Sequence, residues 1–155
     1  MKKLQLFLYF FVIAQFAISQ VKQNESGLYV NANGLLYTGV LETADNGIKK
    51  SVIQVKEGQI SGEAKYYYTT GQLMETGSFD KGLKSGKWIR YNESGIMIGL
   101  ASYSVGKKDG TWIVWDDGGK KRFEMTYKNG EKTGVWNQWD EKGDLLATKD
   151  YGQVN

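Results

Sequence analysis

The sequence predicts an all-β protein, an elongated antiparallel β-meander of repeated 24-residue hairpins, preceded by a signal peptide helix. Three observations support this prediction: glycines recur every 24 residues, aromatic side chains keep the same interval, and apolar and polar residues alternate between the glycines. A fixed period of this length is typical of repeat architectures, and alternation with a period of two is typical of strands. The 20 glycines, 14% aromatic residues and absence of proline fit short strands joined by many turns.

The first 20 residues, MKKLQLFLYFFVIAQFAISQ, are the first predicted element. Two lysines precede an apolar run that ends at Ile18, and small residues follow, which is the pattern of a secretory signal peptide. We expect cleavage between Ser19 and Gln20, leaving residues 20–33 as an N-terminal segment. An uncleaved anchor helix is the alternative, but the run is interrupted by two glutamines and is shorter than the roughly 20 residues that cross a bilayer. The protein is therefore expected to be exported, and to be periplasmic, at the cell surface or secreted.

The repeat domain is predicted to cover residues 34–152 in five units, the first of them degenerate. Three series of glycines define the 24-residue interval. These are Gly58, Gly82, Gly106 and Gly130; then Gly62, Gly86, Gly110 and Gly134; and finally Gly71, Gly95, Gly119 and Gly143. In the first unit, which starts at Gly34, Gly39 comes one residue late and Val55 stands in an aromatic slot.

Aromatic residues occupy three slots of the unit. The first slot holds Phe79, Tyr103, Tyr127 and Tyr151, the second holds Trp88, Trp112 and Trp136, and the third holds Tyr67, Tyr91, Trp115 and Trp139. We expect the first two slots to form a buried structural ladder in which each tryptophan stacks on its copies and on small residues opposite. The third slot is followed by polar residues, so we expect partly exposed rings there and predict it as a binding face.

Each unit reads as two strands and two turns. In the third unit GTWIVWD is the outgoing strand and KKRFEMTYK is the return strand. Asn129-Gly130 predicts a type I′ turn, and Asp117-Gly118 gives the same signal at the hairpin tip. Trp112 and Trp115 are three residues apart, so either both faces of the sheet carry aromatic rings or a bulge intervenes. The stretch LLATKDY, residues 145–151, is expected to form the closing edge strand.

These residues resemble the MORN repeats, in particular the bacterial variant found in YwqK-like antitoxins. The resemblance rests on GKWIRYNESG, GTWIVWDDGG and GVWNQWDEKG, followed by YSVG and YKNG, and on YTG at residues 37–39. It implies an open, curved antiparallel meander that serves as a scaffold or contact surface rather than one particular activity. An antitoxin of this type would meet its toxin inside a cell, whereas this chain begins with a predicted export signal.

Composition argues against several classes of function. Without residues 1–19 the chain carries 18 basic and 17 acidic side chains, so there is no electrostatic footprint for nucleic acid. The chain has no histidine and no cysteine, which removes the commonest metal ligand, the usual general base and any disulfide. Acidic residues such as Asp116, Asp117 and Asp140 can be imagined as a pair flanking a glycosidic bond, but aspartate beside glycine is what turns require.

The sequence therefore predicts a non-catalytic, exported repeat protein that acts as a protein-interaction or ligand-binding scaffold in the cell envelope. No cofactor or metal is expected, and the partner is predicted to be another protein or an envelope polymer, with no nucleic acid and no membrane span after signal cleavage. Two alternatives remain at this point. One is an antitoxin or immunity partner of a toxin, and the other is a carbohydrate-active enzyme.

Overall fold

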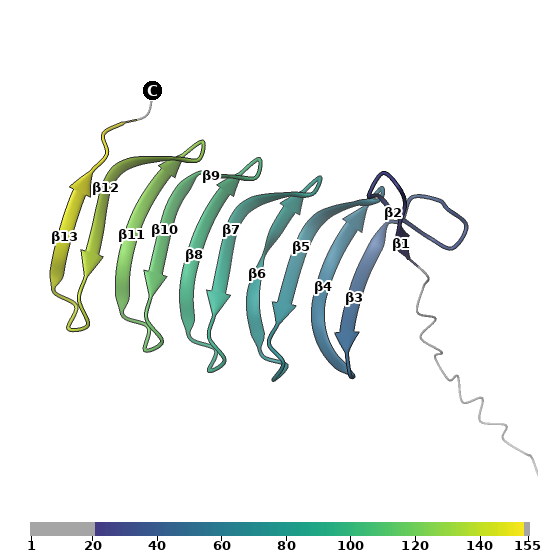
Figure 1. The fold of residues 1–155 in the computed structure, drawn as a ribbon, viewed down its shortest axis with the longest axis horizontal. Helices are drawn as coiled ribbons and strands as arrows, with labels where there is room; N and C mark the ends of the chain where they lie inside the picture. The colour runs from purple at the N-terminus through teal and green to yellow at the C-terminus, as the bar shows by residue number, and fades with distance from the viewer. Residues whose placement is uncertain (1–20, 154–155) are drawn as a thin grey trace, which may run out of the picture.

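The computed structural model describes residues 21–153 and consists of one long, single-layered antiparallel sheet (Figure 1). The predicted signal peptide, including the cleavage site, lies outside these residues. Residues 21–153 contain no helix, and therefore none that is long and apolar enough to cross a membrane. The all-β prediction is confirmed.

The sheet is an antiparallel meander in which strands that follow one another along the chain pair, except that β9 and β10 both pair with β8. Its strands are β3 (Gly39–Asp45), β4 (Ile48–Lys56), β5 (Gln59–Tyr67), β6 (Leu73–Asp80), β7 (Leu83–Tyr91), β8 (Met97–Ser104), β9 (Lys107–Lys108), β10 (Gly110–Trp115), β11 (Lys121–Lys128), β12 (Glu131–Trp139) and β13 (Leu145–Asp150). The short strand β9 pairs with β8 and leads directly into β10, which pairs with β8 and β11. The connections are too short for crossovers, so consecutive hairpins are the only arrangement available.

A two-stranded ribbon lies at the N-terminal end of the sheet. It consists of β1 (Lys22–Gln23) and β2 (Tyr29–Val30). The Tyr29 amide donates to the Gly58 carbonyl at 2.8 Å, and the Gly58 amide donates to the Tyr37 carbonyl at 2.8 Å. The ribbon and the segment after it are therefore tied to the turn between β4 and β5.

The turns that follow the return strands have the backbone that Asn129-Gly130 predicts. Asn129 and Gly130 have φ values of 50° and 94°, both positive as a type I′ turn requires. The equivalent pairs in the other units also have positive φ. These pairs are Glu57-Gly58, Lys81-Gly82 and Val105-Gly106.

The opposite hairpin tips fall near Gly71, Gly95, Gly119 and Gly143 as expected, but the type I′ prediction for Asp117-Gly118 is wrong. Gly119, not Gly118, has the positive φ, and its amide donates to the Asp116 carbonyl at 2.9 Å. Aspartate at the first position and glycine at the fourth are the residues that a type I turn prefers. The tip is therefore a longer loop that runs from Asp116 to Lys120.

Both faces of the sheet carry aromatic rings. Trp112 pairs with Met125 and Trp115 with Lys121, without a break in β10, so the two tryptophans point to opposite faces. The bulge is on the return strand, where the register shifts beside Trp115 and Arg122 is the extra residue. We call the face with Trp88, Trp112 and Trp136 the ladder face and the other one the opposite face.

The single layer leaves little buried apolar surface. The buried hydrophobic residues of the described chain are Val30, Val55, Ala64, Trp88 and Tyr127. Trp88 is the largest of them and is 2% exposed, and its indole lies directly over Gly77, where a Cβ would overlap the ring. The small residue opposite the tryptophan is thus required by close packing.

Exchanging residues between two equivalent turns tests how much the positive φ at the first turn residue costs a β-branched side chain. Val105 has a φ of 47° and is 74% exposed, so its β-branched side chain meets the steric cost of this conformation without compensating packing. We expect Val105→Asn to raise the free energy of unfolding by about 1 kcal/mol and Asn129→Val to lower it by about as much. Denaturant unfolding of both variants measures this, and a lower stability for Val105→Asn would contradict the turn geometry.

Adding one methyl group at two positions tests the packing of the first tryptophan. Gly77→Ala should lower the free energy of unfolding by about 1–3 kcal/mol, because the Cβ has no room beside Trp88. Gly99 is the matched control, since its Cβ would lie 3.4 Å from the Arg90 Cβ, an ordinary contact. Gly99→Ala is expected to be neutral or slightly stabilising. Equal thermal midpoints for the two variants would mean that the indole does not press on the backbone.

Candidate functional site

The ladder face carries a row of alternating aromatic rings that crosses the strands. Tyr103, Trp112, Tyr127, Trp136 and Tyr151 follow one another with ring centroids 5.3, 5.4, 5.0 and 4.7 Å apart and planes inclined by 53–62°. Inclined rings at these separations are favourable aromatic pairs. The predicted stacking of each tryptophan on its copies is wrong, because Tyr127 lies between Trp112 and Trp136, and Trp88 contacts Tyr66 and Phe79 instead.

On the N-terminal side of this row, Trp88 forms a separate aromatic cluster. Phe79 meets the Trp88 ring edge-on at 4.9 Å, and Tyr66 is stacked on it at 6.3 Å. Burial raises the pKa of Tyr66 and of Tyr103, so both hydroxyl groups stay neutral at physiological pH.

Each tryptophan of the ladder is fixed by the same hydrogen bond. The indole Nε1 of Trp88 donates to the Ser78 carbonyl, that of Trp112 to the Ser102 carbonyl, and that of Trp136 to the Thr126 carbonyl, at 3.1, 3.0 and 3.0 Å. Every acceptor lies ten residues before its donor, on the preceding return strand. The ring orientation is therefore set by the backbone and repeats from unit to unit.

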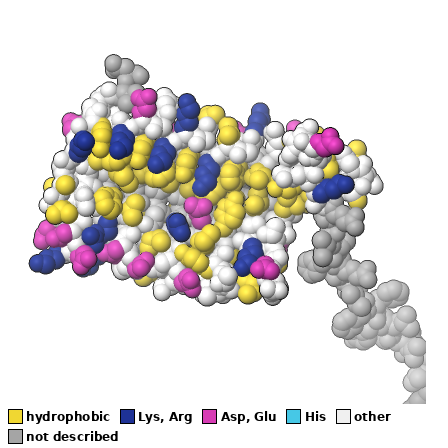
Figure 2. Space-filling view, in the orientation of Figure 1, with side chains coloured by type: hydrophobic (Ala, Val, Ile, Leu, Met, Phe, Trp, Pro, Cys, Tyr) yellow, Lys and Arg dark blue, Asp and Glu magenta, His cyan; other side chains and the backbone are white. Residues whose placement is uncertain are grey.

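Three lysines lie over the tryptophans of the ladder, one in each of three units, and a fourth, Lys149, lies over Tyr151 at its end. The ammonium nitrogens of Lys84, Lys108 and Lys132 are 3.7, 4.2 and 4.7 Å from the ring centroids of Trp88, Trp112 and Trp136. Each also lies within 5.3 Å of the centroid of a tyrosine ring. A lysine over an aromatic face is a cation–π pair. Figure 2 shows dark blue groups at regular intervals along a hydrophobic band across the sheet.

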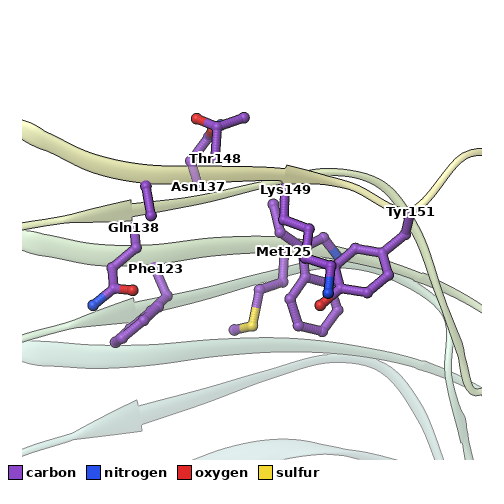
Figure 3. A pocket seen from close by; sticks show the side chains of 9 residues that line it. Phe123, Met125, Asn137, Gln138, Thr148, Lys149 and Tyr151 are labelled. Carbon is purple, nitrogen blue, oxygen red and sulfur yellow. The ribbon is translucent and has the colours of Figure 1, made fainter.

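The ladder face is hollowed at two places beside the row. One hollow of about 360 Å³ lies between β7 and β10, where the small residues Gly99 and Ala101 separate Trp88 from Trp112. The other, of about 370 Å³, lies at the C-terminal end and is lined by Met125, Trp136 and Ala147, among others. Figure 3 shows Phe123, Met125 and Gln138 on one side of the strands, and Asn137 and Thr148 on the other.

The third aromatic slot lies on the opposite face, near the hairpin tips. It holds Tyr67, Tyr91, Trp115 and Trp139, and all four are half-buried. Within residues 21–153 none of these rings packs against another ring at stacking distance. The Trp139 ring is covered by Lys121, whose Nζ is 4.7 Å from the centroid, and borders a hollow of about 400 Å³.

The two predicted rows differ less in burial than the sequence suggests. Trp88 is buried, but Trp112 and Trp136 are half-buried, as are the rings of the third slot. The difference lies in their contacts, because rings of the ladder touch one another and rings of the third slot do not. Within residues 21–153 no second layer covers either face, so a side chain there is buried only by its neighbours within the sheet.

The acidic residues at the tips serve the turns. The Asp116 Oδ1 accepts the Gly118 and Lys120 amides at 3.1 and 2.9 Å, and the Asp140 Oδ1 accepts the Lys142 and Asp144 amides at 2.8 and 3.0 Å. These backbone hydrogen bonds lower the pKa of both carboxyl groups and keep them ionised at neutral pH. Neither is therefore suited to act as a general acid.

Residues 21–153 bring together no cluster of three or more acidic side chains that could hold a metal ion. A third acid near the turns, Asp109, also has a structural partner, since its Oδ2 accepts the Asn129 amide at 3.1 Å. This hydrogen bond lowers the pKa of Asp109.

The lysines of the ladder are the feature that the sequence prediction missed. None of these three lysines is among the site residues predicted from the sequence. The sequence does contain a pattern that indicates them, because Lys84, Lys108 and Lys132 keep the same 24-residue interval as the glycines. A search for periodicity among charged residues would have found them.

Comparison with known proteins gives two matches to one family model. Residues 60–81 and 108–129 both match the MORN repeat variant. No curated protein matches the chain. The two matched segments begin at equivalent positions of their units. The first runs from β5 to the turn after β6, and the second runs from the end of β9 to the turn after β11. These two segments are similar to the MORN repeat variant, and the antiparallel hairpin array agrees with this similarity.

Proposed function

We propose that this protein is a non-catalytic scaffold, exported to the cell envelope, that binds another protein or an envelope polymer through aromatic side chains. One observation carries the proposal: a single-layered sheet displays half-exposed aromatic rings in register on a face that no other part of the described chain covers. MORN repeats are in general binding repeats, which agrees with such a role. The signal peptide predicted from the sequence of residues 1–19 supports the location in the envelope.

The row of Tyr67, Tyr91, Trp115 and Trp139 on the opposite face is the proposed contact for the partner. These rings contribute little to each other's packing, so their half-exposed faces remain free to take up a ligand. Large aromatic groups dominate the affinity of many protein interfaces, because they bury much area at a low cost in side-chain entropy. The hollow beside Trp139 adds a concave, partly apolar end to this row.

The chemistry of the acidic residues supports a non-catalytic role. A glycosidase requires one carboxyl group with a raised pKa as the acid and a second as base or nucleophile. Here the pKa of Asp109, of Asp116 and of Asp140 is lowered, in each case first by a hydrogen bond from a backbone amide. Ionised carboxylates that accept turn amides stabilise the hairpins instead.

Replacement of one aromatic row at a time separates binding from folding. We expect the triple variant Tyr91→Ala, Trp115→Ala and Trp139→Ala to lose its partner in affinity capture from envelope extract while keeping a cooperative thermal transition. The variant with alanine at Trp88, Trp112 and Trp136 should not fold. Losing the buried Trp88 alone costs about 3–5 kcal/mol, the half-buried Trp112 and Trp136 lose their ring contacts and indole hydrogen bonds as well, and a whole domain is stable by only about 5–15 kcal/mol.

The measurement is a thermal melt of both triple variants together with quantitative comparison of captured proteins. A partner that is retained by the first variant would contradict the proposed contact row. If the captured partner is a toxin, the protein joins the YwqK-like antitoxins that its repeats resemble.

Export has its own test. Protein recovered from the native host is expected to begin at Gln20, because the peptidase should cut after Ser19. N-terminal sequencing or intact mass measurement of the envelope fraction gives the answer. An intact Met1 in an integral membrane fraction would overturn the assignment of residues 1–19 as a cleaved signal.

A further inference from the structure

We propose that the ladder face is a second binding surface, and that its ligand is an extended acidic peptide in the polyproline II conformation with a carboxylate at every third residue. This inference goes beyond the scaffold role proposed above, because it uses the other face of the sheet and names a ligand. It rests on the charge of the lysine row, on its spacing, and on the hollows beside it.

The lysine row attracts anions. Within residues 21–153, Lys108 and Lys132 have no carboxylate at ion-pair distance, and Lys84 has only Glu75, at 3.7 Å. Each ammonium group faces aromatic rings on one side, which leaves its other donors for a ligand. A charge held against an apolar surface is less screened than one surrounded by water, so a carboxylate binds more strongly there.

The spacing of the row fits one peptide conformation. Lys84, Lys108 and Lys132 occupy equivalent positions, and one repeat advances the sheet by two strands, which is about 9.4–9.8 Å. A polyproline II helix has three residues per turn with a rise of 3.1 Å each, so every third side chain returns to the same face after about 9.3 Å. Carboxylates three residues apart can therefore meet successive lysines.

Other peptide conformations fit less well. In a β-strand, side chains three residues apart point to opposite sides, so only one of two successive carboxylates would face the sheet. In an α-helix the same face returns after seven residues, or about 10.5 Å, and the mismatch accumulates to roughly 2 Å over three lysines. The distance between successive lysines therefore matches a polyproline II peptide with a carboxylate at every third residue better than a β-strand or an α-helix.

The hollows supply places for the residues between the carboxylates. The two hollows, of about 360 and 370 Å³, are lined by rings of the ladder such as Trp112 and Trp136 and by small residues such as Ala101 and Ala147. Aromatic-lined grooves dock proline-rich segments, because the ligand is already extended and loses little entropy. The hydrophobic band with its row of basic groups is visible in Figure 2.

The first experiment compares two peptides of identical composition on the full-length protein. One is a fluorescein-labelled peptide of four Glu-Pro-Pro triplets, and the other has four glutamates together at one end followed by eight prolines. Fluorescence anisotropy should show at least about tenfold tighter binding of the periodic peptide, because only that one engages three lysines at once. Equal affinities, or no binding of the periodic peptide, would overturn the inference.

The second experiment removes the positive charges of the lysine row. The triple variant Lys84→Gln, Lys108→Gln and Lys132→Gln should bind the periodic peptide at least about tenfold more weakly than the unchanged protein. The matched control is the triple variant Lys56→Gln, Lys87→Gln and Lys107→Gln, which makes the same change of charge at exposed positions of the opposite face. The control should stay within about twofold of the unchanged protein. The inference fails if the two variants weaken binding equally.

Two further outcomes separate this inference from its alternatives. If an oligosaccharide of uronic acids binds through the three lysines and the periodic peptide does not, the surface serves an acidic glycan and the peptide assignment is wrong. The variant with alanine at Tyr91 and Trp139, neither of which lines the two hollows, should still bind the periodic peptide, and the lysine variant should still capture the envelope partner. Failure of one surface is thereby distinguished from failure of the other.

Discussion

The structure depends on one interaction that recurs in three units, the clamp of a tryptophan over the preceding return strand. Each indole donates to a backbone carbonyl of that strand ten residues earlier, and the Trp88 indole also packs directly against Gly77. The described residues form no second layer over this sheet that could bury its side chains, and the sequence has no cysteine to form a disulfide. The clamp therefore couples each hairpin to the one before it, and the stability of the array is a sum of such nearest-neighbour terms.

The sequence predicts the order of the strands well because the turns dictate it. Paired residues of positive φ, as at Asn129-Gly130, require tight hairpins, and tight hairpins leave only a meander. The tip at Asp117-Gly118 was mispredicted because its turn type depends on loop length. That length is set by a bulge on the return strand at Arg122, which no local pair of residues reveals.

The candidate site is less predictable, because burial here depends on the neighbours across the sheet. Trp88 is enclosed by Tyr66, Phe79 and the bare backbone of Gly77, whereas the equivalent Trp136 lies next to the last strand and has Lys149 opposite. Identical slots in the repeat thus acquire different exposure. The lysine row was overlooked for a related reason, since a charged residue near a turn looks solvated until the ring beneath it is known.

The same periodicity that builds the sheet also shapes what can bind to it. Because the hydrogen bonds and ring contacts repeat, groups at equivalent positions of the ladder face are held at constant intervals by the backbone rather than by flexible loops. One lysine over one ring attracts a carboxylate only weakly, as exposed ion pairs generally do. A ligand with a matching interval adds several such contacts within one binding event, so the array favours long periodic ligands over short ones of the same charge. Selectivity then comes from the spacing of the units, which the tryptophan clamp maintains.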